Sequence, residues 1–147
     1  MLAVLGACLI VLPGPVVEPF GPIGAYGGHW GVDVAMVPKA AVVAPLTGTV
    51  SFAGQVAGVQ TVTIRHGASR VSVSYLSEVW VETGQRVERG QRIGRSGVHA
   101  GRHAVHTSVR RGETYVDPQR WTCPGGAVGG TLRLLPPMLA GLVEAPS

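Results

Sequence analysis

Short runs in which hydrophobic and polar residues alternate recur along the middle of the chain. The alternation is clearest in residues 61–65 (Thr-Val-Thr-Ile-Arg) and 70–75 (Arg-Val-Ser-Val-Ser-Tyr), and a period of two is that of a strand with one buried face. Glycines and prolines separate the runs and interrupt every helical period. The pattern predicts an all-β fold, an antiparallel sandwich or small barrel, with strands at residues 41–44, 49–53, 59–65, 70–76, 79–82, 103–110 and 114–116.

Composition fits a single packed domain. The chain has 147 residues, of which 46% are hydrophobic and 14% charged, which excludes intrinsic disorder and leaves no room for two domains of ordinary size. The formal net charge is +4, but the arginines are dispersed along the chain. A nucleic-acid-binding protein more often gathers them in one stripe with aromatic residues. We therefore expect no nucleic-acid partner.

An apolar run occupies residues 2–12 (LAVLGACLIVL) and ends at Pro13. It is too short to span a bilayer and has the length of the hydrophobic region of a secretory signal. No basic residue precedes it and no A-x-A cleavage site follows, so a buried strand is the alternative. Cys8 lies inside this run, far from Cys123, and for that reason we expect no structural disulfide in the mature domain.

Four segments are expected from these signals. Residues 1–15 are a signal peptide or apolar leader, 16–27 a Pro/Gly-rich approach, 28–122 the domain, and 123–147 a Gly/Pro-rich tail with a candidate last strand at 131–135. The leader predicts a secreted or envelope-associated, extracytoplasmic protein. Membrane contact would then arise only through an uncleaved leader.

Three residues form a candidate metal site. His29 and Asp33 are four residues apart beside glycines that let the backbone bend, and His106 lies in a predicted strand far downstream. Two nitrogens and one oxygen suit zinc, and three protein ligands leave a fourth position for water, as in hydrolytic zinc sites. From spacing alone, a hydrogen-bonded His–Asp pair at the surface is the alternative.

A longer series of motifs accompanies these three residues in a fixed order. It comprises His29-x-x-x-Asp33-Val-Ala, Pro45-Leu-Thr-Gly48-Thr-Val50, Val62-Thr-Ile-Arg-His66-Gly67, Thr83-Gly84-Gln-Arg-Val87-x-x-Gly90-Gln-x-Ile93-Gly94 and Val105-His106-x-x-Val109-Arg-Arg-Gly112-Glu-Thr-Tyr-Val-Asp117-Pro118. From about Gly28 to Pro118 the chain resembles the lysostaphin-type, or LytM-like, zinc endopeptidases, which cut peptide cross-links of bacterial cell walls.

The resemblance implies a fold, a cofactor and a substrate class. The fold is an antiparallel half-barrel or sandwich of the duplicated hybrid motif type, with Zn²⁺ held by residues matching His29, Asp33 and His106. The partners it implies are peptide stems or cross-bridges of peptidoglycan.

Two positions depart from the family pattern. Active members carry two further histidines that assist the chemistry, and the matching positions here are Ala104 and Tyr75. His103 is a poor substitute, because residues 104 and 106 of a strand point to one face and residue 103 to the other. The phenol of Tyr75 could donate a hydrogen bond to a developing oxyanion, so Tyr75 is the candidate catalytic residue; an aromatic of the core or of the groove wall is the alternative.

The sequence leaves two functions open. One is a zinc endopeptidase of the cell wall, and the other is a catalytically inactive homologue that binds the wall or regulates a partner enzyme. A biotinyl or lipoyl carrier is excluded, because the single lysine, Lys39, does not lie at a suitable hairpin tip. His66 reads as an exposed turn residue, and His99 as either solvated or lining the groove.

Overall fold

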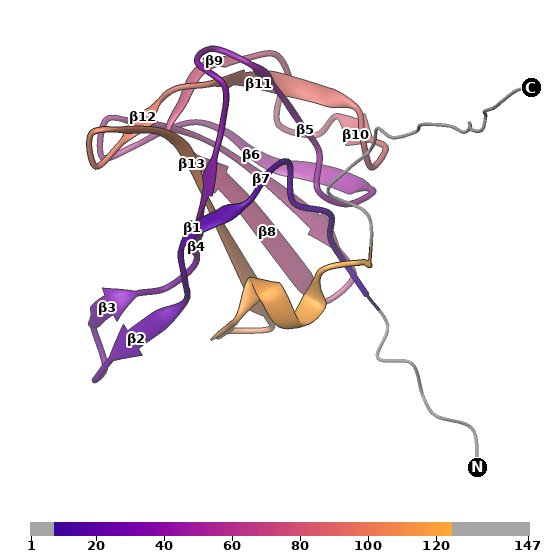
Figure 1. The fold of residues 1–147 in the computed structure, drawn as a ribbon. Helices are drawn as coiled ribbons and strands as arrows, with labels where there is room; N and C mark the ends of the chain where they lie inside the picture. The colour runs from indigo at the N-terminus through magenta and orange to yellow at the C-terminus, as the bar shows by residue number, and fades with distance from the viewer. Residues whose placement is uncertain (1–7, 125–147) are drawn as a thin grey trace, which may run out of the picture.

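The computed structural model describes residues 8–124, and nearly all of its regular structure is β (Figure 1). A single 3₁₀ turn, η1 (Pro118–Trp121), follows the last strand of the described range. The strands are β1 (Val16–Glu18), β2 (Gly21–Ile23), β3 (Gly27–His29), β4 (Val32–Ala35), β5 (Ala41–Val43), β6 (Gly48–Val56), β7 (Val59–His66), β8 (Ser69–Ser74), β9 (Leu76–Val79), β10 (Arg86–Val87), β11 (Arg92–Ser96), β12 (Val98–His99), β13 (Arg102–Arg111) and β14 (Thr114–Val116).

Three antiparallel sheets make up the domain. The largest has nine strands in the order β1-β4-β13-β8-β7-β6-β10, with β12 and β14 also paired to β13. A three-stranded sheet, β5-β11-β9, lies beside it, and the β2–β3 hairpin projects from the body of the molecule (Figure 1). The prediction of an all-β, antiparallel fold is confirmed.

The core lies between the large sheet and the three-stranded sheet. Along β8 the side chains of Val71 and Val73 are buried, whereas those of Ser72 and Ser74 on the other face are half-buried, as the alternating sequence predicts. Val42 and Ile93 of the small sheet belong to the same buried cluster. Burying a valine or isoleucine fully stabilises the fold by roughly 1.5–3 kcal/mol, so this layer fixes the sheet whose other face carries the site.

Two predicted strands are divided or absent in the structure. The run predicted at 70–76 is divided at Tyr75, whose φ is +67°, and β9 begins immediately after it. The run predicted at 79–82 is wrong as a separate strand, because β9 ends at Val79 and a turn follows, closed by a hydrogen bond from Gln85 N–H to the Glu82 carbonyl (3.0 Å). Alternation alone did not reveal either break.

Cys8 and Cys123 form a disulfide, so the prediction that no structural disulfide forms is wrong. Ile10 pairs with Thr122, which brings the two cysteines together although 115 residues separate them in sequence. Ile10 is 0% exposed and Leu12 is also buried. Packing therefore extends beyond the predicted domain of residues 28–122, whereas removal of a leader stays a prediction.

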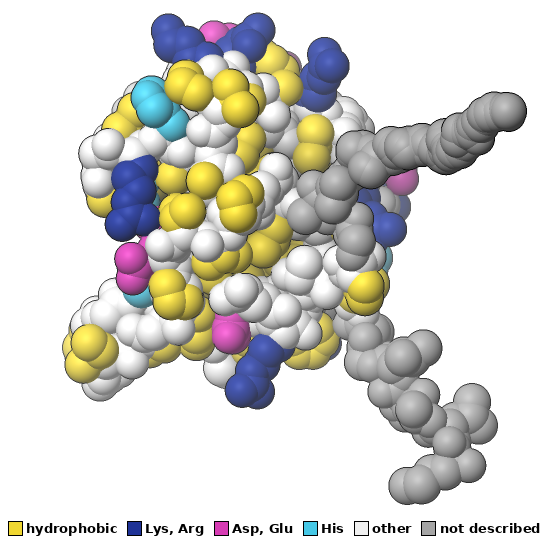
Figure 2. Space-filling model, viewed as in Figure 1, with side chains coloured by type: hydrophobic (Ala, Val, Ile, Leu, Met, Phe, Trp, Pro, Cys, Tyr) yellow, Lys and Arg dark blue, Asp and Glu magenta, His cyan; other side chains and the backbone are white. Residues whose placement is uncertain are grey.

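Other predicted segments gain structure or lie outside it. Residues 16–27, expected as an extended approach, form β1 at the edge of the large sheet and most of the β2–β3 hairpin. The candidate strand at 131–135 lies outside the described residues. Among residues 8–124, no helix is long and apolar enough to cross a membrane. Figure 2 shows the Lys and Arg side chains of one face in separate groups around its edge.

Candidate metal centre

The register of two neighbouring strands places Asp33 beside His106. β4 and β13 are antiparallel, and Asp33 pairs directly with His106, so their side chains project to one face of the sheet within reach of each other. The Nδ1 atom of His106 lies 2.9 Å from Asp33 Oδ1. Asp33 is 5% exposed, and a buried carboxylate requires partners of this kind.

The β2–β3 hairpin brings His29 to the same carboxylate. His29 ends β3, and its Nε2 lies 3.1 Å from Asp33 Oδ1. Its Nδ1 lies 2.8 Å from the Pro19 carbonyl oxygen, which can only accept, so Nδ1 carries the proton. In the neutral imidazole, Nε2 then faces Asp33 as an acceptor. A cation between these two acceptors would satisfy both, and an outer hydrogen bond of this type is usual for metal-binding histidines.

His99 is a fourth member of the cluster, and the sequence analysis did not select it. β12 pairs with β13, and His99 Nε2 lies 3.4 Å from Asp33 Oδ2. One ligand atom from each of His29, Asp33, His99 and His106 lies within 4.8 Å of the other three. These four residues could hold a metal ion. No comparable sequence signal marks His99, because its place depends on the turn at Ala100 and Gly101.

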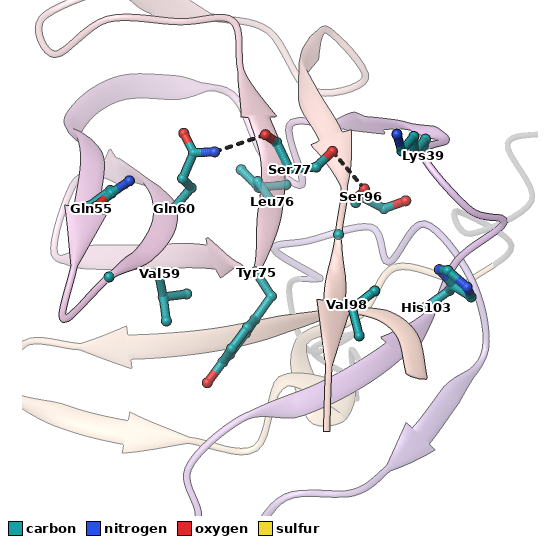
Figure 3. A pocket seen from close by; sticks show the side chains of 12 residues that line it. Lys39, Gln55, Val59, Gln60, Tyr75, Leu76, Ser77, Ser96, Val98 and His103 are labelled. Carbon is teal, nitrogen blue, oxygen red and sulfur yellow. Dashed lines mark hydrogen bonds between the residues drawn. The ribbon is translucent and has the colours of Figure 1, made fainter. Parts of the chain in front are cut away.

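The remaining candidates lie outside this cluster. Ala104 is buried and offers no polar group. Tyr75 stacks on His99, with ring centroids 3.8 Å apart, and lines an open pocket of about 510 Å³ with His103; Figure 3 shows Tyr75 and His103 on the two sides of Val98. His66 is exposed, with its Nδ1 2.9 Å from the Thr47 carbonyl oxygen, as expected for a turn residue.

Burial determines the protonation of His106. Desolvation lowers the pKa of the His106 imidazole, while the hydrogen bond and charge of Asp33 act in the opposite direction. The net lowering favours the neutral imidazole near neutral pH. That is the form of histidine that binds metal ions.

Gly31 leaves the space that the His106 ring occupies. A Cβ at residue 31 would collide with the carbonyl oxygen of Thr107 and would lie 2.6 Å from His106 Nε2. We expect Gly31→Ala to displace β13 locally, to lower the free energy of unfolding by about 1–3 kcal/mol and to weaken metal binding about 10–100-fold. Denaturant unfolding and zinc titration measure the two effects.

Gly21→Ala is the matched control, because a Cβ there meets nothing within 4 Å although Gly21 pairs with His29. Equal metal affinity in the two variants would contradict the role given to Gly31.

Comparison with known proteins identifies the family. The model of peptidase family M23 matches residues 27–118. An uncharacterized metalloprotease of Haemophilus influenzae is 33% identical over 128 residues, covering 79% of this chain and 27% of that protein. The structure of Helicobacter pylori Csd3 superimposes with a TM-score of 0.70 and 26% identity, over 80% of this chain and 34% of Csd3.

The catalytic domain of lysostaphin, an antimicrobial peptidase from Staphylococcus simulans, superimposes with a TM-score of 0.59 and 28% identity, over 73% of this chain and 88% of that domain. This chain thus spans about a quarter of the H. influenzae relative (27%) and a third of Csd3 (34%). The resemblance drawn from the motifs is confirmed: the chain belongs to peptidase family M23.

Proposed function

We propose that this chain is an extracytoplasmic zinc metallopeptidase domain that hydrolyses peptide cross-links of bacterial peptidoglycan. The observation that carries the proposal is that His29 and His106 both approach the carboxylate of Asp33. Zinc bound there would supply a Lewis acid that polarises a peptide carbonyl and lowers the pKa of water to about 7. The chain's own residues would hold the metal, orient the peptide and stabilise developing charge.

A groove beside His106 supports a peptide substrate. It has a volume of about 400 Å³ and is lined by Trp30, Tyr115, Arg110 and a floor of small hydroxyl side chains. Two hydroxyl pairs on this floor, Thr61–Ser74 (3.0 Å) and Thr63–Ser72 (2.7 Å), come from adjacent strands. Hydroxyls both donate and accept, so they suit the amide groups of a peptide stem, and a guanidinium suits its carboxylates.

Tyr75 is our candidate for the group that donates to the oxygen of the attacked carbonyl. Its ring extends away from Leu76 and Ser77, with the hydroxyl at the far end (Figure 3). The phenol is a hydrogen-bond donor, and loss of one oxyanion donor typically costs about 100–1000-fold in kcat. Tyr75→Phe removes this donor alone and keeps the ring that stacks on His99.

A second candidate function is binding to the wall, or regulation of a partner enzyme, without turnover. The observation that favours it is the chemistry at the two positions where active relatives carry assisting histidines. Ala104 has no group that accepts a proton, and Tyr75 offers a phenol, a hydrogen-bond donor, in place of an imidazole base. The groove and the metal ligands would serve binding equally well.

The disulfide supports the proposed location. Structural disulfides form and persist outside the reducing cytosol, and Cys8–Cys123 joins both ends of the packed region. Peptidoglycan peptides are accessible to a protein there.

The test incubates the full chain, supplied with zinc, with purified cross-linked peptidoglycan. New free amino groups, and the matching fragments by mass spectrometry, measure hydrolysis; co-sedimentation with the insoluble wall measures binding. We expect new amino groups with the wild-type chain and none with His106→Ala or after chelation.

His66→Ala serves as the control for loss of an imidazole outside the cluster. Co-sedimentation without new amino groups would overturn the hydrolase and leave the binding module. Neither binding nor hydrolysis would overturn both functions.

A further inference from the structure

We propose that His99 is a fourth protein ligand of the metal, so that the site is closed by His29, Asp33, His106 and His99 rather than left with three ligands. This inference rests on the metal binding in the proposed function but not on hydrolysis. It differs from the three-ligand site that the sequence motifs predict.

The β12–β13 hairpin fixes where His99 stands. Its two loop residues, Ala100 and Gly101, both have positive φ (52° and 75°), as in the tight turn that best matches the twist of paired strands. His99 is the last residue before this turn and pairs with Arg102. A two-residue loop leaves little freedom for the residues on either side of it, so the backbone position of His99 relative to β13 is fixed.

The distance from His99 to Asp33 matches the separation of two zinc ligands. Tetrahedral zinc with bonds of about 2.0–2.1 Å separates its ligand atoms by about 3.3 Å, and His99 Nε2 lies 3.4 Å from Asp33 Oδ2. The other two histidines approach Oδ1 of the same carboxylate, at 3.1 and 2.9 Å. The side chain of His99 is 21% exposed, compared with 22% for His29 and 20% for His106. His99 therefore lies as deep in the site as the two histidines that the motifs identify.

Tyr75 acts as a positioning residue for His99. Its ring centroid lies 3.8 Å from that of His99, with the planes inclined by 31°, and its backbone adopts a φ of +67° that side-chain-bearing residues rarely adopt. Gly97 lets its own backbone lie close to that of Tyr75, since a Cβ at residue 97 would lie 2.5 Å from the Tyr75 carbonyl oxygen. The residue that replaces an assisting histidine thus packs against the imidazole that completes the cluster.

A fourth protein ligand would limit the access of a peptide substrate to the metal. Catalytic zinc sites keep one position open, whereas structural sites have four protein ligands. A peptide carbonyl would reach a site closed by His99 only if His99 left or if the coordination expanded to five. We therefore expect any hydrolysis by the wild-type chain to be slow.

Zinc affinity, measured by competition with a chromogenic chelator, tests the proposal on the full chain. We expect His99→Ala to weaken zinc binding at least 10-fold. Loss of a residue that only hydrogen-bonds to a metal ligand already costs about 10–100-fold in affinity. His103→Ala, which alters a histidine on the same hairpin outside the cluster, should bind as the wild type does. Tyr75→Ala should weaken binding less than His99→Ala, and Tyr75→Phe should restore it, because the ring and not the hydroxyl holds His99.

Cobalt(II) provides a readout that does not depend on activity or affinity. Replacing an imidazole ligand by water changes the ligand field of bound cobalt, so the visible absorption bands should shift in His99→Ala and keep their positions in His103→Ala. Unchanged zinc affinity and an unchanged cobalt spectrum in His99→Ala would overturn the fourth ligand while leaving the proposed function standing. Absence of zinc uptake by the wild-type chain would overturn both.

Discussion

Asp33→Ala should abolish stoichiometric zinc binding. Asp33 is the only carboxylate of the cluster, and each of the three imidazoles lies within 3.4 Å of one of its oxygens. Its removal deletes a proposed ligand and also the negative charge beside the three rings. Because loss of a mere outer partner costs about 10–100-fold in affinity, we expect a loss of more than about 100-fold here, measured by chelator competition and by metal analysis of the purified chain.

Two control variants distinguish the loss of a metal ligand from a loss of folding. Asp33→Asn keeps the volume and one oxygen but removes the charge, so its affinity should lie between wild type and Asp33→Ala. Asp117→Ala removes a half-buried carboxylate outside the cluster that accepts from the Gln119 amide, and it should leave zinc binding unchanged. Near-wild-type affinity in a folded Asp33→Ala chain would show that the metal, if bound, sits elsewhere.

His29, Asp33 and His106 are predicted from their spacing and the family motif, and strand pairing explains how two of them meet. His106 and Asp33 meet through the register of β13 and β4, and register follows from which face of each strand is apolar. The alternating residues of β8 and β13 carry that information in the sequence. Periodicity thus predicts the sheet, whereas the spacing and the family motif predict the three residues; β4, which carries Asp33, is not among the predicted strands.

His99 could not be predicted in the same way. Its position depends on a two-residue hairpin in which Ala100 takes a positive φ, a conformation for which alanine gives no sequence signal. The break at Tyr75 is similar, since nothing in an alternating run marks one residue as left-handed. Both features are local backbone conformations imposed by tertiary packing, and together they place the His99 imidazole beside Asp33.

The N-terminal segment was difficult for a different reason. An apolar run of eleven residues fits a secretory signal and also a buried segment, and composition does not distinguish them. The structure buries Ile10 and joins it to the other end of the domain by hydrogen bonds to Trp121 and Cys123. Only the long-range pairing of Ile10 with Thr122 makes the disulfide geometrically accessible.

Replacing both cysteines, as Cys8→Ser with Cys123→Ser, should lower the free energy of unfolding by about 2–5 kcal/mol. The disulfide spans 115 residues, and cross-links that close long loops constrain the unfolded chain most, by up to about 5 kcal/mol in the loop-entropy estimate. The segment around Ile10 would then be held by its burial and by three backbone hydrogen bonds: from Leu9 and Ile10 N–H to the Trp121 carbonyl (2.7 and 3.1 Å) and from Cys123 N–H to the Ile10 carbonyl (2.8 Å).

Denaturant unfolding of the full chain with and without a reductant checks this expectation. The wild-type chain should lose stability on reduction, whereas the double serine variant should be insensitive to it, and the two reduced states should agree. Zinc affinity should stay unchanged, because none of the four proposed ligand residues belongs to the segments that the disulfide joins. Two titratable thiols in the native, oxidised protein would contradict the cross-link, and equal stability of the two chains would show that the packing around Ile10 suffices to hold the ends together.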